Sequence, residues 1–256
     1  FEVSDVHFLA HKVIAHAGRV TLGSLAKGTD ISAKVNRNCR SATAANHSAT
    51  HLLHAALQEV LGAHVQQKGS LVDHERLRFD FSHGEAMSTV QVDEVERLVN
   101  QQVRANNGVD TRLMDLEEAR AEGAAALFGE RYEDEVRVVS MGEFSLELCG
   151  GTHVHRTGDI GIFRITSESG IAAGVRRVEA LTGEAAYQHS VNESATLSRL
   201  ATALKTGRAD LEERATSLAT RVRELERKIE QLQGQLAAGG TGDDPASEVQ
   251  EVSGIN

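Results

Sequence analysis

Apolar positions recur at helical spacing between about residues 40 and 61. Gly62 stands where such a helix would stop. His47, His51 and His54 fall within about 60° of one another, roughly opposite the centre of the apolar arc. We therefore predict an amphipathic helix whose imidazoles lie away from its core-facing stripe. That stripe consists of Ala49, Leu52, Leu53, Ala56, Leu57 and Val60.

Strand and helix patterns alternate along the next stretch of the chain. The segment "LRFDFSH" alternates apolar and polar residues and predicts a strand. "STVQVDEVERLVNQQVRANN" predicts a helix that begins at a Ser/Thr pair and closes at Asn107-Gly108, and "DLEEARAEGAAALFGE" predicts another. Several strands punctuated by glycines follow over 135–183. This mixture indicates an α+β domain over 36–183.

The two ends of the chain have different patterns. Short apolar runs separated by Gly and charged residues over 1–35 suit short strands and tight turns, a piece of small β-structure. Over 184–239, Leu recurs every seven residues from Leu211, with apolar residues four after each, which predicts a coiled coil or one arm of a helical hairpin. A lone amphipathic helix is the alternative. The tail 240–256 has few large apolar residues and is predicted to be disordered.

Composition narrows the class of protein. The chain has 256 residues, 40% of them hydrophobic, and can bury a sizeable core. A net charge of −10 argues against a generic nucleic-acid binder, so any such contact must be local. The sequence has no run of 18 apolar residues and no signal-peptide layout, so we expect a cytoplasmic protein with no membrane partner.

Two short motifs carry side chains that bind metal ions. In "NHSATH", His47 and His51 lie one helical turn apart, which lets both reach one ion about 2 Å away. In "CGGTH", Cys149 and His153 lie four apart beside a Gly-Gly pair that lets the backbone turn sharply. A thiolate with several imidazoles suits zinc. The two motifs together predict a zinc site, which neither predicts alone.

Three other residues compete for this role. His54 shares the arc of His47 and His51, and spacing alone leaves it a candidate. His155 would lie on the opposite face from His153 if that segment is extended. Cys39 has no histidine at metal-like spacing and is interpreted as an ordinary thiol.

The motifs resemble those of the editing domain of alanyl-tRNA synthetase, which is related to free-standing trans-editing proteins and to the editing domain of threonyl-tRNA synthetase. The resemblance covers about residues 1–240. The "HVQQKGSLV" stretch together with the heptads beyond the domain favours the alanyl enzyme over its relatives. The segments that carry the resemblance are "NHSATHLLHAALQEVLGAHVQQKGSLV", "LRFDFSH", "CGGTHV" and "GIAAGVRRVEALTG".

The resemblance implies an enzyme that hydrolyses the ester of serine or glycine at the 3′ end of tRNA(Ala). It implies one zinc ion per chain and excludes His54 from its ligands. Cys149 and Gln67 are expected to take part in catalysis. The implied zinc ligands are His47, His51, Cys149 and His153. The residues implied to bind substrate are Thr50, Gln67, Ser70 and Arg176.

The resemblance also implies how the chain is organised. The strands over 1–35 resemble the end of a translation-factor-like β-barrel. The coil is a possible homodimer contact, or it pairs with a later segment. Because the chain starts without Met and its coil breaks off, we expect a fragment rather than a complete free-standing deacylase. The rival interpretation from another class is a non-catalytic, zinc-stabilised module that binds tRNA or protein.

Overall fold

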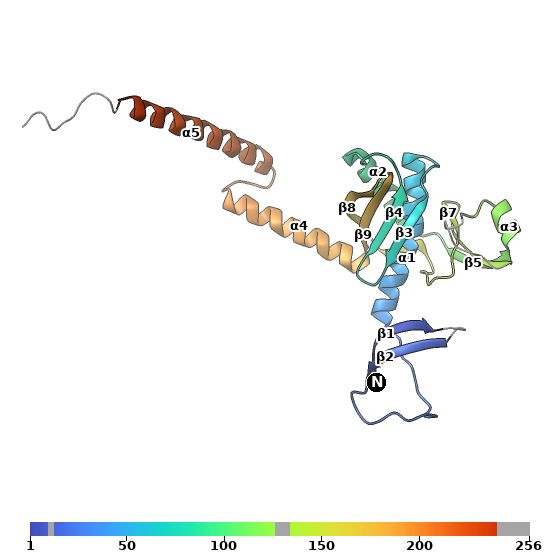
Figure 1. The fold of residues 1–256 in the computed structure, drawn as a ribbon. Coiled ribbons are helices and arrows are strands. Elements are labelled where there is room, and N and C mark those ends of the chain that lie inside the picture. Colours follow the sequence, from blue (N-terminus) through green and yellow to red (C-terminus); the bar gives the residue numbers. More distant parts are fainter. Residues whose placement is uncertain (10–12, 126–133, 240–256) are drawn as a thin grey trace, which may run out of the picture. The chain divides into compact units, whose positions relative to one another are not determined.

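The computed structural model describes residues 1–9, 13–125 and 134–239 (Figure 1). The predicted disordered tail lies outside the described residues, as does the end of "DLEEARAEGAAALFGE". The chain divides into two compact units, Phe1–Ser41 and Ala42–Asn256.

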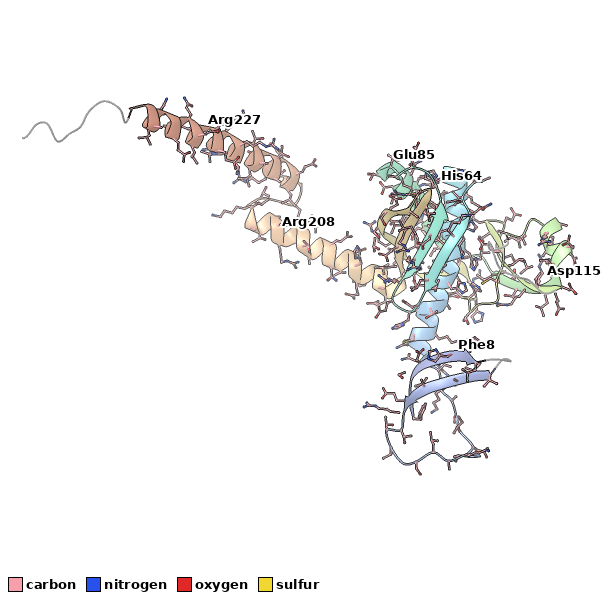
Figure 2. The ribbon with its side chains drawn as sticks, in the orientation of Figure 1. Phe8, His64, Glu85, Asp115, Arg208 and Arg227 are labelled. Atoms are coloured by element: carbon pink, nitrogen blue, oxygen red, sulfur yellow. The ribbon has the colours of Figure 1, made fainter. Side chains whose placement is uncertain are left out.

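The first unit contains an antiparallel hairpin. Strand β1 (Glu2–Leu9) pairs with β2 (Val13–Arg19). Its large apolar side chains are exposed, and Phe8 is 82% exposed (Figure 2). The described residues of this unit form no closed barrel, so the partial barrel stays a prediction.

The second unit is built around a long helix and a four-stranded antiparallel sheet, which confirms the predicted α+β class. Helix α1 (Arg37–Leu61) ends one residue before Gly62, whose φ of 114° only glycine adopts freely. The sheet has the order β3-β4-β9-β8. Its strands are β3 (Gln67–Val72), β4 (Leu77–Ser82), β8 (Phe163–Ala172) and β9 (Val175–Thr182).

One face of this sheet forms the core. Phe79 and Phe81 of β4 alternate with polar residues and pack with Leu52 and Leu53 of α1 in one buried cluster. Helix α2 (Thr89–Ala105) adds Val95, Val99 and other apolar residues to the same cluster. It begins at a Ser88 capping box and ends at Asn106, whose left-handed backbone stops the helix one residue before the predicted Asn107-Gly108.

A smaller sheet with the order β5-β6-β7 follows, with helix α3 beside it. Its elements are β5 (Val109–Asp115), α3 (Leu116–Ala121), β6 (Glu135–Met141) and β7 (Ser145–Leu148). The chain then passes through the 3-10 helix η2 (Thr157–Ile160) into β8. The segment that follows β7 crosses α1 and brings Cys149 to the helix.

This crossing overturns one prediction about α1. The expectation that the imidazoles lie away from the core is wrong for His51 and His54, which are only 5% and 6% exposed. Helical periodicity assumes one covering layer, but α1 is covered on one side by the four-stranded sheet and on the other by the segment around Glu147.

Two further helices follow the sheet. Helix α4 (Gly183–Ala203) begins directly after β9, and α5 (Leu211–Gly239) carries the heptad pattern. The described part of the predicted segment 184–239 is therefore two helices rather than one. Along α5, Val222, Leu225, Ile229 and Leu232 are about half exposed, and polar side chains such as Arg227 project from it (Figure 2). The coiled coil stays a prediction.

Candidate metal centre

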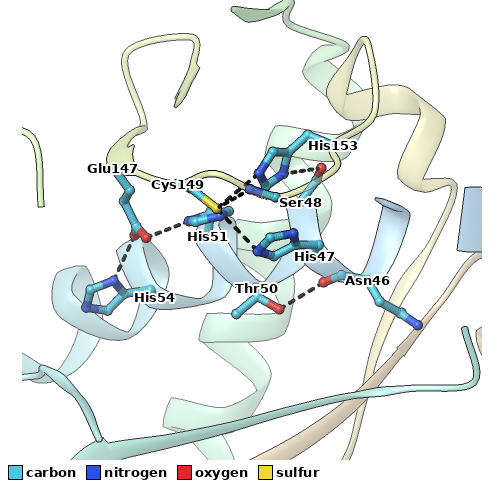
Figure 3. A network of polar contacts seen from close by, with 10 residues as sticks. Asn46, His47, Ser48, Thr50, His51, His54, Glu147, Cys149 and His153 are labelled. Carbon is cyan, nitrogen blue, oxygen red and sulfur yellow. Dashed lines mark hydrogen bonds and ion pairs between the residues drawn. The ribbon is translucent and has the colours of Figure 1, made fainter. Parts of the chain in front are cut away.

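The two predicted ligand motifs meet in space. His47 and His51 project from α1, and Cys149 and His153 come from the segment after β7 (Figure 3). One ligand atom from each of these residues lies within 4.8 Å of all the others. The Cys149 sulfur lies 3.4 Å from Nε2 of His47 and 3.3 Å from Nε2 of His153. Two pairs of donors about 100 residues apart in sequence thus come together in one cluster.

The Gly-Gly turn fits closely against α1. A Cβ atom on Gly151 would overlap the ring of His47, whereas one on Gly150 would meet no atom within 4 Å. Arg137 of β6 donates from Nη1 to the carbonyl oxygens of Cys149, at 3.0 Å, and Gly151, at 2.5 Å. The hydrogen bonds from Arg137 therefore hold the turn in place. The missing side chain of Gly151 lets the turn lie close to His47.

A buried carboxylate lies behind the cluster. Glu147 of β7 is 5% exposed, and its Oε2 lies 2.5 Å from Nδ1 of His51. Its Oε1 lies 2.8 Å from Nδ1 of His54. Sequence reasoning missed Glu147, although the alternation of a strand places it on the same face as Cys149, two residues on.

The hydroxyl of Ser48 contacts Nδ1 of His153, as the carboxylate of Glu147 contacts Nδ1 of His51. Ser48 Oγ lies 3.2 Å from Nδ1 of His153 and accepts a hydrogen bond from the Val154 amide at 3.1 Å. His51 and His153 therefore both engage an oxygen through Nδ1, which leaves Nε2 to face the cluster. Sequence reasoning also missed Ser48, because its partner lies 105 residues away.

These residues fit a metal ion. Nε2 of His51 is buried and has no hydrogen-bond partner within the described part of the chain, which is costly unless something else binds it. An ion among the four donors would supply that partner. A histidine that binds a metal through Nε2 usually donates a hydrogen bond from Nδ1 to an oxygen, as His51 and His153 are placed to do.

The charge of Cys149 supports the same conclusion. Burial opposes ionisation of Cys149, but hydrogen bonds from His153 and His47 outweigh it and lower the pKa of the thiol to about 3. Burial likewise opposes the charge of His51, yet the Cys149 sulfur and Glu147 raise its pKa to about 10. Hydrogen bonds from His51 and His54 lower the pKa of the buried Glu147 to about 2. Cys149 is thus held as a thiolate, the form that binds metal.

The residues predicted to bind substrate lie on α1 and on the sheet. Thr50 is 5% exposed, and its hydroxyl donates to the Asn46 carbonyl at 2.9 Å (Figure 3). Gln67 of β3 and Arg176 of β9 both pair with Phe81 of β4, so they lie in one row on the same face of the sheet. Ser70 is exposed on β3.

Arg176 has a tight partner of its own. Its Nε and Nη2 donate to Glu168 at 2.5 and 2.7 Å, which raises the pKa of the guanidinium. Within the described residues, no hydrogen bond joins Thr50, Gln67, Ser70 or Arg176 to the four donors of the cluster. Their role in a substrate pocket stays a prediction.

The competing residues lie outside the cluster. Cys39 is a free thiol near the start of α1, and His155 is exposed, with its carbonyl accepting from the Val109 amide. His54 contacts Glu147 and is not among the four grouped donors.

Comparison with known proteins first defines the class of domain. Residues 136–179 match the family described as the threonyl and alanyl tRNA synthetase second additional domain. That match covers nearly all of β6, together with β7, the "CGGTH" motif, β8 and the first part of β9, whereas β3 and β4 of the four-stranded sheet precede it.

Three relatives that match nearly the whole chain are alanine–tRNA ligases. The chain is 56% identical over 241 residues to the alanine–tRNA ligase of Hydrogenovibrio crunogenus, 52% over 255 to that of Methylococcus capsulatus, and 50% over 255 to that of Shewanella loihica. These matches cover 94–100% of the chain but only 28–29% of each relative. The resemblance to alanyl-tRNA synthetases is therefore confirmed, and the chain is homologous to one segment of an alanine–tRNA ligase. No described helix has the length and apolarity needed to span a membrane.

Proposed function

We propose that this chain is the editing part of an alanine–tRNA ligase, which hydrolyses the ester of serine or glycine on the 3′ end of tRNA(Ala). The observation that carries the proposal is the four-donor cluster of His47, His51, Cys149 and His153, with its ligand atoms within 4.8 Å. The whole ligase would attach alanine to tRNA(Ala) with ATP, and we expect no aminoacylation by this segment.

Zinc is the metal that this donor set favours. One thiolate and three imidazoles match the ligands and the tetrahedral number of protein zinc sites, so we expect one ion per chain. When bound, zinc supplies a positive charge that polarises an ester carbonyl or a water molecule. The chain's own residues must bind and orient the aminoacyl group beside it.

Selectivity requires polar groups that recognise the hydroxyl of serine. Thr50 uses its proton on Asn46, so its oxygen is left as an acceptor. The Gln67 amide has both a donor and an acceptor. Alanine lacks the hydroxyl and would leave such groups unpaired, a difference that supports discrimination of about 10⁴-fold. The alanine ester would therefore be spared relative to the serine ester, whereas the glycine ester, which also lacks the hydroxyl, is not selected by these groups.

The tRNA end needs positive charge in a chain that is acidic overall. In this proposal Arg176 contacts the tRNA end and Ser70 lies near the amino-acid pocket. Glu168 engages Nε and one N–H of Nη2 of Arg176, so Nη1 and the second N–H of Nη2 are the donors left to face a phosphate. The same ion pair fixes the orientation of the guanidinium before tRNA arrives.

A second candidate is a non-catalytic module in which zinc only holds the fold together. The complete set of four protein donors favours it, because structural zinc sites are closed whereas catalytic sites keep an open position. The module would still bind tRNA or a protein partner. The two candidates differ in one measurable property, turnover of the ester.

The test is release of serine from mischarged tRNA(Ala) under single-turnover conditions with protein in excess. We expect serine to be released faster than in buffer, while correctly charged alanine stays largely intact. Gln67→Ala should lower the rate, whereas Gln66→Ala, a matched change at the exposed neighbouring glutamine, should not. A folded, zinc-loaded chain that binds the mischarged tRNA yet hydrolyses it no faster than buffer would establish the non-catalytic module.

A further inference from the structure

The third histidine of the "NHSATHLLH" segment has no place in the ligand set. His54 is 6% exposed, and its ring lies 5.4 Å from that of Phe79 in the core. Its Nδ1 lies 2.8 Å from Oε1 of Glu147. Burial of an imidazole costs free energy, because its polar nitrogens lose their contact with water. A leucine here would avoid that cost, so the hydrogen bond to Glu147 is the interaction that only the histidine can make.

Glu147 joins this histidine to a ligand. Its two carboxylate oxygens are divided between two imidazoles, Oε1 to His54 and Oε2 to His51. One carboxylate can reach both because residues three apart on a helix are neighbours on its surface. All three side chains are buried, so neither oxygen has water as an alternative partner.

We propose that Glu147 and His54 are positioning residues that hold His51 with its Nδ1 protonated and its Nε2 directed at the metal. The inference rests on the metal centre of the proposed function and adds a layer of residues behind it. In this arrangement His54 donates a hydrogen bond from Nδ1 to Oε1 of Glu147. His51 donates from its own Nδ1 to Oε2 of the same carboxylate. His54 therefore acts through Glu147.

The direction of each hydrogen bond follows from what the groups can do. A carboxylate only accepts, so each imidazole must donate from the nitrogen that faces it. With the proton of His51 fixed on Nδ1, Nε2 carries the lone pair that a metal requires. If His54 were apolar, Oε1 would be buried without a partner, and Glu147 could turn away from His51 to satisfy it.

The other imidazoles of the cluster are held differently. Nδ1 of His153 faces the hydroxyl of Ser48, and Nδ1 of His47 makes no hydrogen bond within the described residues. Among the three ligand imidazoles, and within the part of the chain that the structure describes, only His51 is held by a buried charged group that has a second partner. The position of His51 therefore depends on Glu147 more than that of the other ligands does.

Zinc affinity, measured by competition with a chromophoric chelator, tests this arrangement in Glu147→Gln, His54→Leu and the double variant. A glutamine amide has one acceptor and one donor and cannot accept from both imidazoles, so Glu147→Gln should weaken zinc binding about 10- to 100-fold. His54→Leu removes one hydrogen bond at similar volume and should weaken it roughly two- to tenfold. The double variant should bind about as weakly as Glu147→Gln alone, because His54 acts through Glu147.

Two further variants separate positioning from stability. His54→Asn keeps a donor near the position of Nδ1 and should restore part of the affinity lost in His54→Leu. Leu57→Ala, a buried apolar change on the same helix, should lower the melting temperature without changing zinc affinity. The absorption spectrum of the Co²⁺-loaded protein should change in Glu147→Gln and not in Leu57→Ala, since it reports the geometry of the ligands.

The outcomes separate this inference from the proposed function. Unchanged zinc affinity in Glu147→Gln, or losses that add in the double variant, would overturn the positioning role while the metal centre stands. A wild-type chain that binds no zinc would overturn both. Zinc binding with the expected losses but no ester hydrolysis would support the positioning role and overturn only the hydrolase.

Discussion

Gly151 lies against the imidazole of His47 with no space for a side chain between them. The contact joins the turn after β7 to α1 at His47, the first of the two candidate metal ligands on that helix. Substitution of Gly151 by alanine should push the His47 ring or the turn aside, destabilise the fold by about 1–3 kcal/mol and lower the metal content. Elemental analysis and thermal unfolding of the purified variant measure both effects.

Gly150 provides the matched control for this prediction. A Cβ atom there would meet nothing within 4 Å, so Gly150→Ala should leave metal content and stability nearly unchanged. Equal metal content in the two alanine variants would contradict the proposed fit between the turn and the helix.

The two cysteines allow a test of the ligand assignment within one chain. Both are free and half-buried, but only Cys149 lies among histidine nitrogens. Cys149→Ala should reduce the bound zinc well below one ion per chain, because a three-imidazole site lacks the thiolate. Cys39→Ala should retain one ion. A zinc content unaffected by Cys149→Ala would remove that residue from the site.

The metal-free protein should be most stable on a plateau between about pH 6.5 and 9. The raised pKa of His51 contributes stability that is present below 6.5 and is lost as the pH rises towards about 10. The lowered pKa of Cys149 contributes stability that is present above 9.0 and is lost as the pH falls towards about 3. Between 6.5 and 9.0 the two changes offset each other, so stability should fall on either side of this range.

Urea unfolding in the presence of a chelator, repeated across pH, measures this dependence. Glu147 acts in the same direction at the acid end, because its pKa is lowered from 4.5 to about 2. Cys149→Ala should flatten the acid limb above about pH 5. A wild-type stability that rises steadily from pH 7 towards pH 5 would contradict the assigned charges.

Helix α5 should associate with a second copy in a parallel two-stranded coil. Its a and d positions are apolar over more than three heptads, and Arg221 at g can meet Glu226 at e of the partner helix. Leu225→Asp at d should abolish association, whereas Thr220→Asp at the outward f position should not. Sedimentation over a range of concentrations measures this. A strict monomer throughout would exclude the parallel dimer.

Local signals predicted most of the elements and the two short ligand motifs. Gly62 and Ser88 mark a helix end and a helix start through backbone chemistry that neighbouring residues determine. The spacing of the two ligand motifs was informative because each is short and lies on one element. Their meeting was inferred from zinc chemistry and from the family resemblance, since no local pattern encodes it.

What the sequence did not show depends on contacts between distant segments. Glu147 and Ser48 find their partners 96 and 105 residues away, and nothing near either residue signals the pairing. The burial of His51 depends on a second layer over α1, which the helix's own periodicity cannot report. The break between α4 and α5 follows a lysine with positive φ, Lys205, two residues before Gly207.

His47 and Cys149 stand 102 residues apart in the chain, and this separation sets an order of events during synthesis. His47 and His51 on α1 are synthesised first. Cys149 is added only after β7 has been made, so until then the site consists of two imidazoles without a thiolate. A metal ion that binds all four donors would link α1 to the turn after β7 and close a loop of about 100 residues, as a disulfide does. All four donors are therefore available to a metal ion only after the turn beyond β7 has been made, and finished chains in a cell short of that metal would lack this link between α1 and the turn.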